Sequence, residues 1–232
     1  MPFFYMDYWY LVLVLPAVLV SVWAQYKVKS TFSKYSNKMV GNRMTGAGVS
    51  RYIQQVNGIN THIEAVAGEL SDHYDPRSNV IRLSQPVYDR STVAAIGVAA
   101  HETGHALQHA EGYIPVKIRT KMVPITNFAS SISSILIVLG IVMSIQPLAY
   151  AGIALFSVAT LFQLVTLPVE FNASSRAVAA LENSGQFTQE ELNGVKKVLT
   201  AAALTYVAAL LVSAMTLLRL ILVVGGNGRR RN

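Results

Sequence analysis

The sequence predicts a mainly α-helical membrane protein, with about four transmembrane helices and a small α+β lobe. The first observation is composition: 52% of the 232 residues are hydrophobic and only 13% are charged, an apolar excess that is typical of membrane proteins. The second is a set of four apolar runs, each long enough to cross a bilayer. The third is a polar segment of mixed pattern after the first run, which includes the motif H-E-x-x-H.

Charge and cysteine content limit the possible functions. The formal net charge is +7, but the basic residues follow the apolar runs and form no basic groove with interleaved aromatic residues. This arrangement indicates membrane topology and argues against a nucleic-acid partner. The chain has no cysteine, so a disulfide framework is excluded and any metal site must use His, Asp or Glu.

The first apolar run, residues 8–24, predicts a transmembrane helix because Tyr and Trp residues lie near both of its ends. A cleaved signal peptide is disfavoured, since residues 1–7 contain no Lys or Arg. Several lysines follow the run, beginning at Lys27. By the positive-inside rule we expect the N-terminus outside and the following lobe in the cytoplasm.

Three more runs predict spans at residues 123–145, 148–167 and 201–224, the last of which contains Arg219 as a snorkelling residue. Four simple crossings would place the basic tail at Arg229 outside, against the positive-inside rule. Either the last segment is re-entrant or hairpin-like, or the charges of the tail are overruled.

These features divide the chain into five segments. They are an N-terminal transmembrane helix (residues 1–24), a cytoplasmic lobe that carries the motif helix (25–122), a transmembrane hairpin (123–168), a cytoplasmic helical segment (169–200), and a C-terminal transmembrane helix with a basic tail (201–232).

The lobe should contain both helices and strands. A short helix is expected from Tyr35 to Met44, and an amphipathic helix within residues 45–56. Residues 62–66 predict a short strand. Residues 79–84 alternate in part, are rich in β-branched residues and predict a second strand.

The motif His101-Glu102-Thr103-Gly104-His105 lies within residues 92–109, which predict a buried helix with Ser91 as its N-cap. Positions i and i+4 share one helix face, so His101 and His105 can bind one metal ion. Glu102 cannot join them on that face, but it could take a proton from a water molecule beside the metal. The alternative is a helix with two solvated histidines.

Catalytic zinc normally has three protein ligands and one open position. Glu170 is the best candidate for the third ligand, because it is a lone carboxylate among apolar residues, on a new helix that we expect Pro168 to begin. The alternative is an ion pair between Glu170 and Arg176. His109 drifts around the face of the motif helix and could only support a ligand from a greater distance.

Several blocks of the sequence together resemble the YugP-type neutral zinc metallopeptidases of bacterial membranes, from about residue 5 to residue 222. A wider similarity is to the gluzincins, including the HtpX-type membrane proteases. The blocks are Asp72-His-Tyr-Asp-Pro, Val80-Ile-Arg-Leu-Ser, Ala94-Ala-Ile-Gly-Val-Ala-Ala-His-Glu-x-Gly-His-Ala-x-Gln, Gly112-Tyr and Leu167-Pro-Val-Glu-Phe-Asn-Ala-Ser.

This resemblance implies proteolysis by a zincin-like lobe with a Zn²⁺ ion. It implies that His101 and His105 are ligands, that Glu102 is the general base, and that Glu170 is the ligand from a later helix. Gluzincins often have an Asp four residues after that Glu, and here Ser174 takes its place. A hydroxyl holds an imidazole less firmly, so Asn172 is a further candidate for support.

We therefore expect metal-assisted hydrolysis of peptide bonds at the cytoplasmic membrane face, on membrane proteins or their flexible segments. The developing oxyanion needs a donor, for which Arg176 is the first candidate and Tyr113 and His109 are alternatives. An extended substrate could add to an edge strand through main-chain hydrogen bonds, the alternative being an ordinary hairpin. The strand residues proposed for this role are Asn79, Val80, Ile81, Arg82 and Leu83.

Two other functions remain open. The first is a zinc-stapled membrane scaffold or adaptor without turnover, which Ser174 at the supporting position favours. The second is a transporter, which is disfavoured because the spans lack central carboxylates. The expected partners are the lipid bilayer, protein or peptide substrates, and a membrane protein that controls access to the site.

Overall fold

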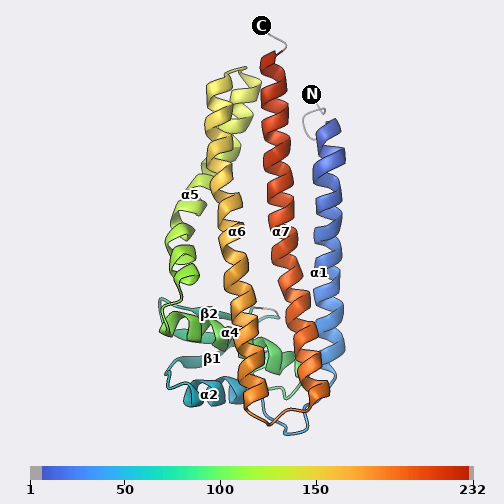
Figure 1. The fold of residues 1–232 in the computed structure, drawn as a ribbon, viewed down its shortest axis with the longest axis vertical. Helices are drawn as coiled ribbons and strands as arrows, with labels where there is room; N and C mark the ends of the chain where they lie inside the picture. Colours follow the sequence, from blue (N-terminus) through green and yellow to red (C-terminus); the bar gives the residue numbers. More distant parts are fainter. Residues whose placement is uncertain (1–6, 70, 230–232) are drawn as a thin grey trace. The chain divides into compact units, whose positions relative to one another are not determined.

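The computed structural model describes residues 7–69 and 71–229 and is mainly helical with one small sheet (Figure 1). Arg230–Asn232, the end of the predicted tail, lie outside the described residues. In chain order the elements are a π-helical turn (Tyr10–Val14), α1 (Leu15–Ser36), α2 (Gly46–Val56), β1 (His62–Val66), β2 (His73–Asp75), β3 (Val80–Ser84), α3 (Gln85–Tyr88), α4 (Val93–Ala110), α5 (Ile114–Val142), α6 (Gln146–Asn183) and α7 (Gln189–Arg229).

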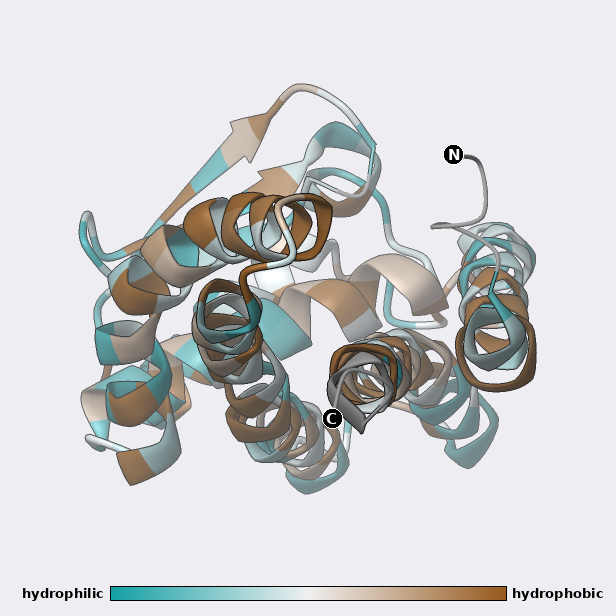
Figure 2. Ribbon diagram, turned by 90° about the horizontal axis from the view of Figure 1, so that it is seen from above, coloured by the Kyte–Doolittle hydropathy of each residue, from teal (hydrophilic) through white to brown (hydrophobic). Residues whose placement is uncertain are grey.

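Within residues 7–69 and 71–229, four helices are long and apolar enough to cross a membrane, in agreement with the four predicted spans. They cover Tyr10–Ser36, Ile114–Val142, Gln146–Asn183 and Gln189–Gly226. In Figure 2, brown, the colour of hydrophobic residues, recurs along the long helices, which are seen end-on in this view.

These helices run further than the apolar runs alone suggested. α1 continues to Ser36, so the separate helix expected from Tyr35 to Met44 is wrong. Pro168 lies inside α6, so the expectation that it begins a new helix is also wrong. Proline removes one backbone donor and its ring crowds the preceding turn, and the continuous helix of 38 residues accommodates both effects. α7 is likewise continuous from Gln189 to Arg229, which rules out a re-entrant last segment.

The chain forms two compact units. The first comprises residues 1–24, 118–167 and 205–232. In it α5 and α6 approach closely at Gly152, where a Cβ atom would lie 2.8 Å from the Ile137 backbone nitrogen. Arg219 is paired with Asp7, with 2.6 Å between Nη2 and Oδ2, and its guanidinium lies over the Tyr10 ring. This arginine is therefore neutralised by an acid rather than by snorkelling alone.

The second unit comprises residues 25–117 and 168–204 and contains the sheet. The strand order is β1-β3-β2, with β1 parallel and β2 antiparallel to β3. The prediction that residues 79–83 form an edge strand is therefore wrong, because β3 is paired on both sides. Ile81 and Leu83 are fully buried, as expected for the central strand of a sheet. The edges are β1 and β2.

Helix α4 forms the centre of this second unit. Its buried apolar residues, such as Ile96 and Ala100, belong to one cluster with residues of α2, α6 and α7. Its N-cap is Thr92, whose Oγ1 accepts the Ala95 N–H, and not Ser91 as predicted. Ser91 instead donates its hydroxyl hydrogen to the Arg43 carbonyl oxygen. The helix therefore begins one residue later than expected.

Candidate metal centre

The motif residues lie on α4 in the arrangement that their spacing predicts. The rings of His101 and His105 are neighbours, with centroids 4.7 Å apart and planes at 81°. Gly104 lies between them in sequence and faces α6 so closely that a Cβ atom there would be 2.6 Å from the Ala173 carbonyl oxygen. The missing side chain thus lets α4 approach the backbone of α6, the helix that carries Glu170.

The Glu170 carboxylate joins the two imidazoles. Its Oε2 lies 3.3 Å from His101 Nε2 and 3.5 Å from His105 Nε2, and the residue is only 2% exposed. One ligand atom from each of the three residues can be chosen so that all lie within 4.8 Å of one another. The structure therefore brings together the three residues that were predicted as ligands.

This donor set fits a zinc ion. Two imidazole nitrogens and one carboxylate oxygen are a common protein ligand set of catalytic zinc. Ligand atoms at the usual zinc distances lie about 3.3 Å apart in a tetrahedron, which agrees with the two separations between Glu170 and the histidines. Three protein ligands would leave the fourth position for water or substrate.

Side chains from both helices orient the two histidines through Nδ1. Ser174 Oγ lies 3.1 Å from His101 Nδ1, where the sequence comparison with gluzincins expected a supporting group. Gln108 Oε1 lies 3.0 Å from His105 Nδ1. A hydrogen bond from each Nδ1–H leaves each Nε2 lone pair available for a metal ion.

Gln108 is a site residue that the sequence reasoning missed. Its Nε2 donates to the Val169 carbonyl oxygen at 2.7 Å and to Asn172 Oδ1 at 2.9 Å. Asn172 therefore supports His105 only through Gln108. The available signal was spacing, because Gln108 lies three residues after His105 and so shares its helix face.

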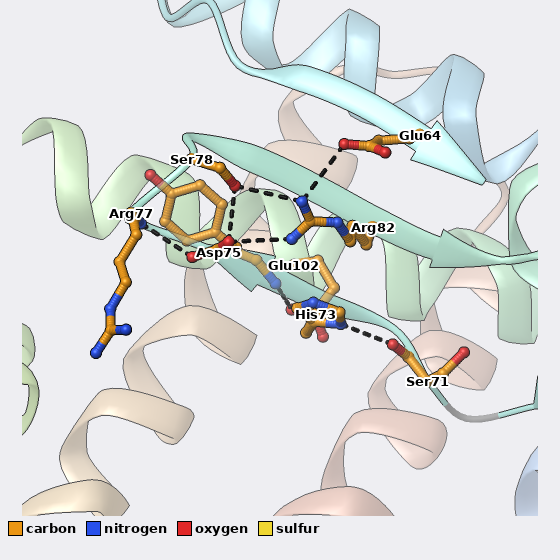
Figure 3. A network of polar contacts seen from close by, with 9 residues as sticks. Glu64, Ser71, His73, Asp75, Arg77, Ser78, Arg82 and Glu102 are labelled. Carbon is orange, nitrogen blue, oxygen red and sulfur yellow. Dashed lines mark hydrogen bonds and ion pairs between the residues drawn. The ribbon is translucent and has the colours of Figure 1, made fainter. Parts of the chain in front are cut away.

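Glu102 is held by the edge strand β2. Its Oε2 accepts the Tyr74 backbone N–H at 3.0 Å, and Figure 3 shows the Glu102 side chain reaching this strand. Glu102 is also buried, at 9% exposure of the whole residue. Tyr74 lies 28 residues before Glu102, and local spacing gave no sign of this contact.

The three candidate oxyanion donors have other interactions. Arg176 donates from Nη1 to Glu111 Oε1 at 2.6 Å and from Nε to Asn172 Oδ1 at 2.7 Å, and its guanidinium lies 5.9 Å from the centre of the Tyr113 ring. This ion pair also holds the pKa of Glu111 below its usual value. The His109 ring lies edge-on to the ring of Tyr74. Arg176 thus joins the Gln108–Asn172 chain, and its partner is Glu111 rather than Glu170.

Two carboxylates fix β2 beside the site. Asp72 Oδ1 accepts the Ser84 N–H at 2.7 Å, and burial raises the pKa of Asp72. Asp75 accepts hydrogen bonds from the Ser78 hydroxyl, the Arg77 N–H and the Arg82 guanidinium (Figure 3), which hold the pKa of Asp75 well below its usual range. Arg82, predicted to contact substrate, is thus engaged in holding the sheet together.

The fold and the site define a membrane protein whose helical lobe offers a metal ion two histidines and one glutamate. The chain belongs to the family described as "putative neutral zinc metallopeptidase", whose model matches residues 10–225. It is similar to the Bacillus subtilis (strain 168) protein described as "Putative membrane protease YugP", with 49% identity over 224 residues, 96% of this chain and 99% of that protein. The resemblance inferred from the sequence blocks is confirmed. No solved structure matches the chain.

Proposed function

We propose that this protein is a membrane-embedded zinc endopeptidase that hydrolyses peptide bonds at the cytoplasmic membrane face. The observation that carries the proposal is the meeting of His101, His105 and the buried Glu170 carboxylate, with Glu102 one residue from the first histidine. The family and the similar Bacillus protein support zinc and proteolysis. The side of the membrane is inferred from the lysines that follow the first span.

His101, His105 and Glu170 would hold the ion, which when bound polarises a water molecule and the scissile carbonyl group. Glu102 accepts a proton from that water molecule while the water oxygen adds to the carbonyl carbon. Glu102 then delivers the proton to the leaving nitrogen as the C–N bond breaks. The hydrogen bond from the Tyr74 N–H fixes the carboxylate during both transfers.

Strand β2, rather than β3, is the edge to which a substrate strand can add. The contact between the Tyr74 N–H and Glu102 places the outer side of β2 next to the proposed base. A peptide lying along this edge would bring its own backbone to the metal ligands, and it would pair through main-chain groups of β2 other than the Tyr74 N–H, which Glu102 holds. Because such pairing uses main-chain groups, we expect an unfolded segment to be the preferred substrate.

The test is the Glu102→Gln variant of the purified full-length protein, assayed on an unfolded protein substrate in parallel with its zinc content. We expect activity to fall by roughly 10²–10⁴-fold, the usual contribution of a general base, while zinc content stays at the wild-type level. Gln retains an oxygen that can accept the Tyr74 N–H, so the fold should be preserved. Glu190→Gln, at an exposed residue paired with Lys38, is the matched control.

The same experiment separates the peptidase from a zinc-stapled scaffold. If the protein is a scaffold, the wild type should show no zinc-dependent cleavage, and chelation of the zinc should unfold the protein. For a peptidase we expect chelation to remove activity but to leave the fold intact, because the Glu170 carboxylate already lies within 3.5 Å of both imidazoles without a metal ion. Equal cleavage by wild type and Glu102→Gln would refute the proposed mechanism.

A further inference from the structure

Helices α1 and α7 enclose a groove of about 650 Å³ that is separate from the metal centre. The two helices run side by side (Figure 1), and each gives one face to the groove. The lining residues recur at helical spacing, which places them in one stripe on each helix. They are Lys27, Thr31, Lys34 and Tyr35 of α1, and Asn193, Lys196, Lys197, Thr200, Ala201 and Leu204 of α7.

The charge of this groove is positive. Four of the ten lining residues are lysines, and no acidic residue is among them. Only Lys196 is compensated, by Glu182 at 2.7 Å. Within residues 7–69 and 71–229, Lys27, Lys34 and Lys197 form no ion pair. Folding has therefore brought like charges from two helices together, and an anionic ligand would relieve their repulsion.

The groove lies where both helices change from polar to apolar sequence. On α1, Lys27 comes three residues after the predicted span ends at Ala24, and on α7 the lining residues Ala201 and Leu204 begin the last apolar run. Both changes occur on continuous helices. The lysines should therefore lie at the depth of the lipid headgroups, with the apolar end of the groove toward the acyl chains.

We propose that this groove binds an anionic phospholipid headgroup. The lysines would pair with the phosphate oxygens, and Thr31, Thr200 and Asn193 would donate to the remaining headgroup oxygens. The apolar end, with Ala201 and Leu204, would contact the start of the acyl chains. The inference requires that the protein spans a membrane, and it does not depend on peptide hydrolysis.

The test uses the full-length protein in neutral detergent. Native mass spectrometry measures the retention of phosphatidylglycerol relative to phosphatidylcholine at equal concentrations. The Lys34→Gln/Lys197→Gln variant should bind phosphatidylglycerol about 25-fold more weakly, at about fivefold for each lysine. The matched control, Lys29→Gln/Lys121→Gln, removes the same charge from exposed positions outside the groove and should retain the wild-type preference.

A second variant keeps every lysine. Thr31→Glu places a carboxylate inside the groove at a helical position that tolerates Glu, and it should also abolish the preference for phosphatidylglycerol. Equal losses in the groove and control variants would overturn the proposal in favour of a general attraction between basic residues and anionic lipid. Displacement of the lipid by an equal concentration of inorganic phosphate would overturn the lipid assignment, because the groove would then recognise phosphate alone.

Discussion

The close approach of α4 to α6 at Gly104 gives a sharp test of how the metal centre is built. An alanine Cβ at this position would lie 2.6 Å from the Ala173 carbonyl oxygen, whereas ordinary contact begins at 3.4 Å. The two backbones would have to separate by about 0.8 Å, which exceeds the positional tolerance of roughly 0.5 Å for a preorganised site. Because His101 and His105 flank Gly104 while Glu170 lies on α6, Gly104→Ala should pull the ligands apart.

Gly97→Ala is the matched control on the same helix. Its Cβ would meet Val195 Cγ1 at 3.4 Å, an ordinary contact. Both variants gain the same helix propensity, about 1 kcal/mol, so the difference between them isolates the clash. Overpacking of this kind costs about 1–3 kcal/mol, and we expect Gly104→Ala to be less stable than Gly97→Ala by that amount.

The assay combines denaturant unfolding of the metal-free proteins with competition for zinc against a chromophoric chelator. Gly104→Ala should bind zinc at least roughly tenfold more weakly than Gly97→Ala, a loss similar to that caused by disturbing groups that orient metal ligands. Equal stability and equal zinc affinity for the two variants would refute the reasoning, because they would mean that α6 yields without moving Glu170.

Two further predictions concern the surroundings of the site. Ser174→Ala should lower zinc affinity or activity about 10–100-fold, because His101 Nδ1 loses its partner, whereas Ser174→Asp should match or exceed the wild type. Chelator competition measures the zinc affinity of both variants, and a peptidase assay measures their activity. A Ser174→Ala variant with wild-type zinc affinity and activity would contradict the assigned role. The lowered pKa of Asp75 predicts a stabilising contribution that is complete above the ordinary Asp pKa of about 3.9 and is lost as the pH falls through the lower folded-state value. When thermal unfolding is measured at pH 6 and at pH 2, the melting temperature of Asp75→Asn should therefore fall less than that of the wild type. The same dependence of melting temperature on pH in both proteins would exclude this contribution.

Sequence patterns predicted the parts of the fold that depend on local chemistry. The apolar runs gave four membrane-spanning candidates. Thr188 and Glu191 have the spacing of a capping box, and before α7 the backbone N–H of each residue donates to the side chain of the other. The errors arose where tertiary structure decides. Pro168 is a reasonable helix start by local rules, but the residues on both sides of it belong to one continuous helix.

The position of β3 in the sheet illustrates the same limit. Its sequence, Val-Ile-Arg-Leu-Ser, predicts a strand but does not state how many neighbours that strand has. Strand β2 has only three residues, and its sequence is too short and too polar to predict a strand. Yet β2 covers one edge of β3 and makes the contact with Glu102. Pairing partners depend on contacts across many residues of chain, so the edge of the sheet emerges only from the structure.

The ligands, in contrast, could be predicted because their chemistry restricts the choice, while the residues that orient them could not. Gln108 explains the difference. Its side chain is fully buried and uses all of its main hydrogen-bonding functions: Oε1 faces His105 Nδ1, and Nε2 donates to the Val169 carbonyl oxygen and to Asn172. Only a neutral amide can accept from an imidazole N–H and also donate to two oxygens. A glutamate would lack the donors, and a lysine would lack the acceptor. The choice of Gln at position 108 therefore depends on the two helices that meet there and on the histidine tautomer that the metal site requires.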